Sequence, residues 1–282
     1  MKPMAIPAKA VSAARPHSTH ARPAHRTLRL SAIRIVLLAA FLTLWEVASG
    51  RVVPEFFLSR PTAIFDRLYG WTMDGSLFFH AAITATEALL GFLLGGTIGL
   101  AVGVLLGRSR FLGELLDPFI MVFYSLPKIA LAPLFILWIG IGMTMKVVLT
   151  ATIVFFLVFL NTYSGVRNVS PELVAIVKLM GAKESDILRK VVLPSALTWV
   201  FAGLRISVPY ALIGAIVGEL MASNRGLGAV LVAAQGQFDT AGVFAALIGI
   251  TTLAYLLNTA VKFAERKSMP WKSSTQDAEI RI

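Results

Sequence analysis

Charged side chains inside long apolar segments are the residues of this sequence best placed to do chemistry. Four of them stand within or beside such segments: Glu87, Lys128, Arg205 and Glu219. A charge at the centre of a bilayer costs about 2.5–3.5 kcal/mol on insertion scales, so these groups are expected to face a protein interior or an interface. They either form structural ion pairs or snorkel to the surface, or Arg205, Glu219 and Glu87 belong to a solute pathway in which Arg205 favours an anion. Because Arg205 and Glu219 lie about 21 Å apart on one helix, we expect Glu87 to be the nearer partner of Arg205.

The residue types of enzyme active sites and metal sites are scarce. The chain has no Cys, and His80 is its only histidine outside the N-terminal segment. It also lacks the Gly-x-x-x-x-Gly-Lys-Ser/Thr sequence that cradles nucleotide phosphates. The sequence therefore predicts no catalytic residue, no metal site and no cofactor bound by this chain, and a membrane-embedded enzyme is disfavoured.

The composition indicates a membrane protein. Of the 282 residues, 57% are hydrophobic and only 15% are charged, whereas soluble domains have about 45–50% and about 25%. The segments do not alternate between polar and apolar residues as barrel strands do. Because a helix satisfies its own backbone in lipid, we predict an all-α membrane protein.

Six segments are long enough to cross a bilayer. Three contain no charged residue: 88–107, 147–166 and 240–261. Three more are interrupted by charges or prolines: 33–49, 119–140 and 195–220. The sequence therefore predicts six transmembrane helices within one transmembrane domain at residues 31–265.

The basic residues predict the orientation of these helices. With six spans and an inner N-terminus, nineteen Lys and Arg residues lie on the inner side and five on the outer side. This asymmetry favours cytoplasmic positions for both termini. Residues 1–30 are basic and rich in proline, so we expect a disordered tail there, with an organelle transit peptide as the alternative. Residues 266–282 are predicted to form a cytoplasmic C-terminal tail. Attraction to membrane lipids explains the basic charge without a nucleic-acid partner.

Glycine recurs at every fourth position of the segment 88–107. The repeat consists of Gly91, Gly95, Gly99, Gly103 and Gly107. On a helix these residues form one groove without side chains, to which another backbone can pack closely. The groove serves either internal helix packing or contact between two copies of the chain.

The longest predicted inner loop, about residues 167–194, has its own helical pattern. Ser170 can cap a helix that begins at Pro171, and Glu172 complements the helix dipole. Gly181 suits a left-handed turn before a second short helix. The apolar face of this helix pair either lies in the lipid headgroups or docks in a groove of a partner protein.

Parts of this loop resemble a known signature. The run from Ala175 to Gly181, followed by Val191-Val-Leu193-Pro194, resembles the inner-loop signature of bacterial ATP-binding-cassette (ABC) importer permeases. The thirteen-residue spacing from Gly181 to Pro194 agrees with that signature. Ala175 departs from it, because the family has Glu there; Glu172, one turn earlier, is the candidate substitute.

Further marks between Val53 and Lys262 resemble the nitrate, sulfonate and taurine branch of this family. They occur in order along the chain: Leu116–Pro118, Leu126–Pro127, Ala132–Leu134, Trp138–Gly142, Asn161–Val166, Gly218–Leu220 and Gly226–Gly228.

The resemblance implies a permease with type I ABC importer architecture in the bacterial inner membrane. It implies transport of a small polar, often anionic solute by alternating access. ATP would be bound by separate ATP-binding cassette ATPase subunits, coupled through the inner loop. The residues implied in coupling are Glu172, Ala175, Gly181, Ala182, Leu193 and Pro194. A periplasmic or lipid-anchored solute-binding protein and a second permease copy, as a homodimer, are the other implied partners. The competing function is a secondary transporter or channel that works without an ATPase.

Overall fold

The computed structural model describes residues 24–269, and those residues are almost entirely helical. Their only β pairing is an isolated bridge between Ser49 and Val53. The short elements η1 and η2 are a 3₁₀-helix and a π-helix. The elements in chain order are α1 (Ala24–Ala48), α2 (Pro61–Met73), α3 (Ser76–Arg108), α4 (Arg110–Ser125), η1 (Lys128–Leu131), α5 (Ala132–Ile139), α6 (Met143–Arg167), α7 (Pro171–Leu179), α8 (Glu184–Ile187), η2 (Leu188–Val192), α9 (Leu193–Ala222), α10 (Leu227–Gly236) and α11 (Thr240–Ser268).

Five helices are long and apolar enough to cross a membrane, and one bent pair makes a sixth candidate. The five are α1, α3, α6, the continuous run α8–α9, and α11; the bent pair consists of α4 with η1–α5. The predicted all-helical membrane protein is therefore confirmed, with five or six spans among the described residues.

Helix α1 forms a unit of its own, separate from the unit that begins at Ser49. Its apolar part, Arg29–Ala48, has the length of a membrane span. Phe41 and Trp45 form an edge-to-face ring pair on it, with centroids 6.0 Å apart. Because α1 already begins at Ala24, residues 24–30 are helical where the sequence predicts a tail, and the rest of that predicted tail lies outside the described residues.

Helix α6 lies at the centre of the second unit. It packs most extensively against α3 on one side and α9 on the other. Met145, Leu149, Val154, Val158 and Phe159 are buried along its length. Side chains of α3 and α9 thus cover the apolar surface of α6. Helix α6 is therefore the central packing element of this unit.

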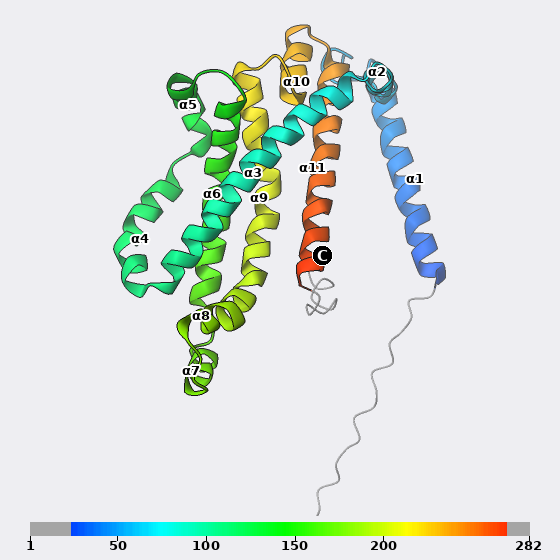
Figure 1. Ribbon diagram of the computed structural model, residues 1–282. Coiled ribbons are helices and arrows are strands. Elements are labelled where there is room, and N and C mark those ends of the chain that lie inside the picture. The colour runs from blue at the N-terminus through cyan, green and yellow to red at the C-terminus, as the bar shows by residue number, and fades with distance from the viewer. Residues whose placement is uncertain (1–23, 270–282) are drawn as a thin grey trace, which may run out of the picture. The chain divides into compact units, whose positions relative to one another are not determined.

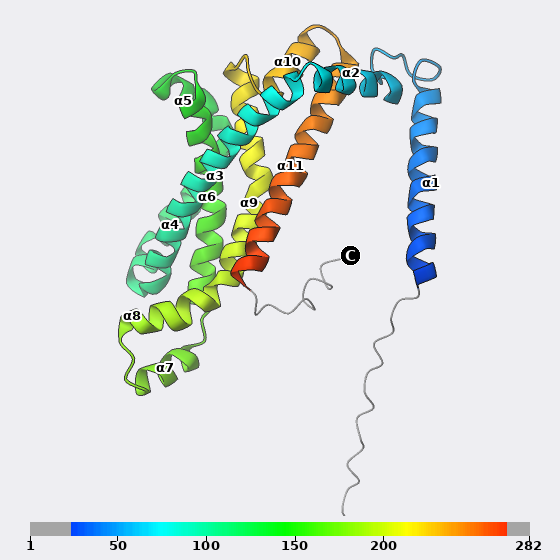
Figure 2. The same cartoon turned by 45° about the vertical axis from the view of Figure 1, so that its right-hand side comes forward.

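The connections of the second unit gather at two opposite ends. The α7–α8 loop, the turn between α3 and α4 and the C-terminal end of α11 lie at one end, which we name the α7 end (Figure 1). Helices α2, α5 and α10 lie at the other end, which we name the α10 end, and the rotated view agrees (Figure 2). Within this unit the segments that the sequence places on the inner side therefore share one end.

The predicted glycine groove faces α6. A β-carbon at Gly99 would lie 2.7 Å from the carbonyl oxygen of Phe155, and one at Gly103 would lie 2.7 Å from Cβ of Thr162. Gly91, Gly95 and Gly107 likewise face α6 residues. The groove is therefore occupied by α6 of the same chain, the arrangement that internal helix packing requires.

The predicted span 119–140 is not one straight helix. Helix α4 already begins at Arg110, and the chain bends by 79° between α4 and the η1–α5 segment. Pro127 explains the break, because the residue before a proline is pushed out of the helical region; Leu126 has ψ 134°.

The second inner helix and the following span are also joined differently from the prediction. Residues Glu184–Ala222 form one run of 39 residues, with the π-helix η2 inside it. Leu193 and Pro194 therefore lie within a continuous helix and do not open a new one. At the C-terminal end, α11 continues three residues beyond the predicted boundary at 265, to Ser268.

Candidate functional site

The predicted coupling loop contains the separate helix α7, whose start has the predicted cap. The Oγ of Ser170 accepts a hydrogen bond from the backbone N–H of Leu173 at 3.3 Å. Pro171 follows in the first turn, where its missing N–H removes no helical hydrogen bond. The Ser170 hydroxyl also donates to the Glu172 carboxylate, which lowers the pKa of Glu172.

Helix α7 exposes apolar side chains. Leu173 and Ile176 are about half exposed, and Leu179 and Met180 are 87% and 80% exposed. Ala175, at the position where the importer-permease signature has Glu, is exposed as well. Large apolar side chains gathered on one exposed surface are typical of an interaction site. Such a surface is covered either by lipid headgroups or by a partner protein.

Gly181 separates α7 from the helix that follows. Its φ of +83° lies in the left-handed region, where glycine is favoured. A β-carbon at this position would have no atom within 4 Å, so the backbone conformation and not the space selects glycine. The N–H of Ala182 closes the turn by donating to the carbonyl of Val177 at 3.2 Å. The predicted left-handed turn is confirmed.

Glu184, the first residue of α8, connects the loop to the rest of the α7 end. Its Oε2 lies 3.0 Å from Nη2 of Arg108 at the end of α3, and its Oε1 lies 2.9 Å from Nζ of Lys178 on α7. All three side chains are exposed, so water and salt screen both pairs and each contributes little to stability. The geometry nevertheless places the loop directly beside the end of a membrane-spanning helix.

A buried polar cluster occupies the α10 end, centred on Glu219 of α9. The Glu219 side chain accepts hydrogen bonds from the Thr84 hydroxyl and from the backbone N–H of Gly228, both at 2.7 Å. The Thr84 oxygen in turn accepts from the N–H of Leu227 at 2.9 Å. Because free N–H groups begin every helix, these two side chains satisfy donors at the start of α10. Glu219 therefore ties α10 to α3 and α9.

Two glycines at the start of α10 leave room for the Glu219 side chain. A β-carbon at Gly228 would lie 2.9 Å from Cβ and Oε2 of Glu219, and one at Gly226 would collide with the same carboxylate. Gly226 also has a φ of +103°. Its N–H donates to Nδ1 of His80 at 3.0 Å, so the only histidine outside the N-terminal segment supports this turn.

Lys146, near the start of α6, is the ion-pair partner of Glu87. The two side chains are 6% and 2% exposed, and the Lys146 ammonium also donates to the Ser223 hydroxyl at 3.2 Å. Glu87 and Glu219 are close enough to interact electrostatically. The prediction that Glu87 pairs with Arg205 is therefore wrong. Burial of both charges makes their pairing necessary.

Arg205 instead pairs with Glu265 of α11. Glu265 is 8% exposed and Arg205 is 31% exposed by their side chains. Arg205 and Glu219 do not pair with each other, as their spacing on one helix predicts. The three predicted solute-pathway residues are therefore not brought together: Glu87 and Glu219 share the cluster at the α10 end, and Arg205 lies elsewhere on α9.

The sequence reasoning missed three residues of these networks: Thr84, Lys146 and Glu265. Lys146 stands immediately before the charge-free segment 147–166, so its position at a segment edge concealed its burial. Thr84 carries no charge, and no sequence signal marks it. No group of three or more His, Cys, Asp or Glu side chains that could hold a metal occurs in residues 24–269.

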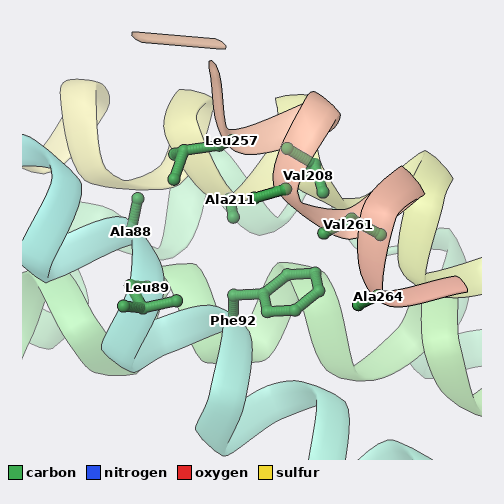
Figure 3. Close-up of a pocket in the computed structure, with 9 residues that line it drawn as sticks. Ala88, Leu89, Phe92, Val208, Ala211, Leu257, Val261 and Ala264 are labelled. Atoms are coloured by element: carbon green, nitrogen blue, oxygen red, sulfur yellow. The ribbon is translucent and has the colours of Figure 1, made fainter. Parts of the chain in front are cut away.

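An apolar cavity of about 190 Å³ lies between α3, α9 and α11 (Figure 3). Ala88 and Phe92 line it from α3, Ala211 from α9, and Leu257 and Ala264 from α11. All of its lining residues have apolar side chains, so they offer a polar solute no side-chain hydrogen bond. This cavity is therefore not a candidate for the transported solute.

Known proteins share this sequence and fold. Residues 95–269 match the family described as "Binding-protein-dependent transport system inner membrane component". A Bacillus subtilis chain that bears the name aliphatic sulfonates transport permease protein SsuC is 35% identical, over 85% of this chain and 87% of that protein. The taurine transport system permease protein TauC of Escherichia coli is 30% identical over 90% of this chain and 94% of that protein. The riboflavin transport system permease protein RibX of Chloroflexus aurantiacus is 34% identical over 86% of this chain and 90% of that protein.

The fold has a solved counterpart in the inward-facing MetNI methionine ABC transporter. The TM-score is 0.60 at 22% identity, with 70% of this chain and 97% of that chain covered. This likeness supports the predicted type I importer permease architecture. The family match contradicts the alternative of a secondary transporter or channel that works without an ATPase. The chain belongs to the binding-protein-dependent transport system inner membrane components: it is a multi-pass inner-membrane permease subunit of an ABC importer and is not itself an enzyme.

Proposed function

We propose that this permease imports a small polar anion of the sulfonate or taurine class, and that its inner loop couples import to a partner ATPase. ATP would bind to the ATPase subunits, and a solute-binding protein would deliver the solute from outside. The family description supports the binding-protein partner, because it names binding-protein-dependent transport. SsuC and TauC support the solute class, while the similar identity of RibX shows that identity alone does not select it.

The observation that carries the coupling proposal is the exposed apolar surface of α7. Leu179 and Met180 are the most exposed of its large apolar residues. A partner groove would remove this surface from water, at a gain of about 25 cal/mol per Å². Movement of α7 would reach the spans through Gly181 and the continuous run Glu184–Ala222, and through the contact of Glu184 with Arg108. We therefore favour the partner protein over the lipid headgroups as the occupant of this surface.

Both termini are proposed to be cytoplasmic, with the α7 end inside. The basic residues described at this end support the orientation, because Lys and Arg accumulate on the cytoplasmic side. They include Arg108, Arg110, Arg167, Lys178, Lys183, Arg189, Lys190, Arg266 and Lys267.

A homodimer is proposed for the complete pathway. Helix α4 packs against its own unit on a limited surface, and Val122 and Phe123 are exposed on it. In this homodimer, the exposed face of α4 would pack against the second copy of the chain.

The coupling proposal is tested by changing the exposed α7 surface. We expect the double substitution Leu179→Asp with Met180→Asp to lower co-purification of the ATPase from mild detergent by about tenfold, because central apolar contacts dominate interface energies. ATP hydrolysis in the recovered material should fall in parallel. The matched control is Lys183→Gln, an exposed polar position in the same loop, which should leave both readouts unchanged. Normal ATPase recovery with the double variant, or solute uptake in vesicles without ATP, would contradict the proposal.

A further inference from the structure

The break between α4 and α5 lies beside a cavity, and one residue that lines this cavity, Lys128, carries a positive charge. The cavity has a volume of about 310 Å³ and is lined by Tyr124, Lys128, Ile153, Phe156, Leu157 and Tyr210. Irregular backbone within a membrane span is tolerated where it is buried in protein or lines a polar cavity. Lys128 is the first residue after this break, in the 3₁₀-helix η1. Charge, cavity and broken helix therefore coincide at one place.

The positive charge of Lys128 is not neutralised by a carboxylate. In the part of the chain that the structure describes, no Asp or Glu oxygen lies within 4 Å of its Nζ, whereas Lys146 and Arg205 each have such a partner. The ammonium donates one hydrogen bond to the carbonyl of Tyr124, which leaves two of its three N–H groups available. Its Nζ also lies 4.6 Å and 4.7 Å from the ring centroids of Tyr124 and Phe156. The aromatic rings hold the charge at the cavity without cancelling it.

We infer that Lys128 is a binding site for the head group of a small organic anion, such as a sulfonate or carboxylate, within the membrane-spanning part of the permease. The two free N–H groups can donate charge-assisted hydrogen bonds to the anion oxygens. Tyr210 adds a hydroxyl-bearing side chain from α9, and the remaining wall is aromatic and aliphatic. A volume near the lower end of known ligand sites fits a small solute. The inference rests on the proposed import function and names the residue that meets its solute.

The competing role for Lys128 is structural. Its bond to the Tyr124 carbonyl caps the last turn of α4, and such a cap needs no ligand. An electrostatic readout separates the two roles, because a cap alone does not attract anions into the cavity.

The absence of Cys from the chain allows a direct test. Tyr210→Cys places the only thiol of this chain at the cavity, and Tyr210 is 45% exposed and so accessible to reagents. The complete transporter, in vesicles of neutral phosphatidylcholine, is treated with the anionic reagent 2-sulfonatoethyl methanethiosulfonate or with its cationic trimethylammonium counterpart. Modification of this chain is read by its mass. We expect the anionic reagent to react faster, and ethanesulfonate to protect the thiol where choline does not.

Substitutions of Lys128 in this background decide the assignment. Lys128→Gln should lower the anion-to-cation rate ratio about tenfold, because one nearby charge attracts one reagent and repels the other. Lys128→Arg should keep the ratio. The control Arg225→Gln removes an exposed cation from the turn before α10 and should not change the ratio. Leu157→Cys provides a second thiol position at the same cavity.

The outcomes distinguish failure of the proposed anion site from failure of the proposed import function. An unchanged ratio in Lys128→Gln, in a transporter that still hydrolyses ATP with its binding protein, would overturn the anion site and leave the import proposal intact. If the unsubstituted chain does not associate with an ATPase, the import proposal itself would be overturned. Folding that fails in Lys128→Gln and recovers in Lys128→Arg, with no ethanesulfonate protection in either background, would assign Lys128 the capping role only.

Discussion

Lys146 and Glu87 show how buried charges act in this protein. Each is almost completely removed from solvent, and each is the nearest opposite charge of the other. Removing one partner of a buried pair leaves an isolated charge and costs about 3–5 kcal/mol, whereas replacing both can cost little. The pair therefore constrains the structure more than it stabilises it.

A double-substitution cycle tests this interpretation. We expect Lys146→Met to destabilise the purified permease by about 3–5 kcal/mol, because Glu87 then remains buried without its ion-pair partner. Adding Glu87→Gln should recover most of the loss. Thermal unfolding in detergent, followed by tryptophan fluorescence, measures both. Equal losses in Lys146→Met and in the double variant would show that the two side chains are not coupled.

At the scale of the elements, close approach between helices decides the packing. Helix α3 presents glycines to α6, and α9 does the same through Gly203, Gly214 and Gly218. In lipid there is little hydrophobic drive for helices to associate, so close van der Waals contact supplies the attraction. This explains why α6 is the most enclosed helix of its unit.

Two adjacent glycines of α3 provide a matched comparison. A β-carbon at Gly95 would lie 2.9 Å from the carbonyl carbon of Ala151, whereas one at Gly96 would lie 3.5 Å from Cδ2 of Leu204. We expect Gly95→Ala to destabilise the permease by about 1–3 kcal/mol, as overpacked cores do. Gly96→Ala should have little effect. The midpoint of thermal unfolding measures both variants, and equal midpoints would show that α3 and α6 can separate without cost.

At the scale of the whole molecule, the arrangement of the second unit assigns distinct tasks to its two ends. The α7 end carries the basic residues, the exposed apolar surface of α7 and the Glu184 contacts. The α10 end carries the buried cluster that fixes α10 to α3 and α9. The broken span holds Lys128 between α4 and α5. Such a division suits a permease that meets an ATPase on one side and a binding protein on the other.

The proposed orientation predicts which positions a membrane-impermeant thiol reagent reaches. In intact cells with the outer membrane opened, Asn224→Cys near the α10 end should react. Lys183→Cys at the α7 end should react only after the inner membrane is permeabilised. Because the chain has no Cys of its own, each variant reports one position. The reversed pattern would invert the orientation.

The sequence by itself determined the helical membrane class, the family and much of the inner loop, because these depend on local composition and spacing. Apolar length identifies spans, Ser170 and Pro171 set a helix start, and Gly181 sets a turn. Only the tertiary structure decided which charges meet. Lys146 pairs with Glu87 and Arg205 with Glu265 because helices distant in the sequence pack side by side. It also decided that the glycine groove faces α6 and that the span containing Pro127 is broken beside a cavity. Side-chain pairing between helices depends on their relative rotation and depth, and no local pattern in one helix records either of them.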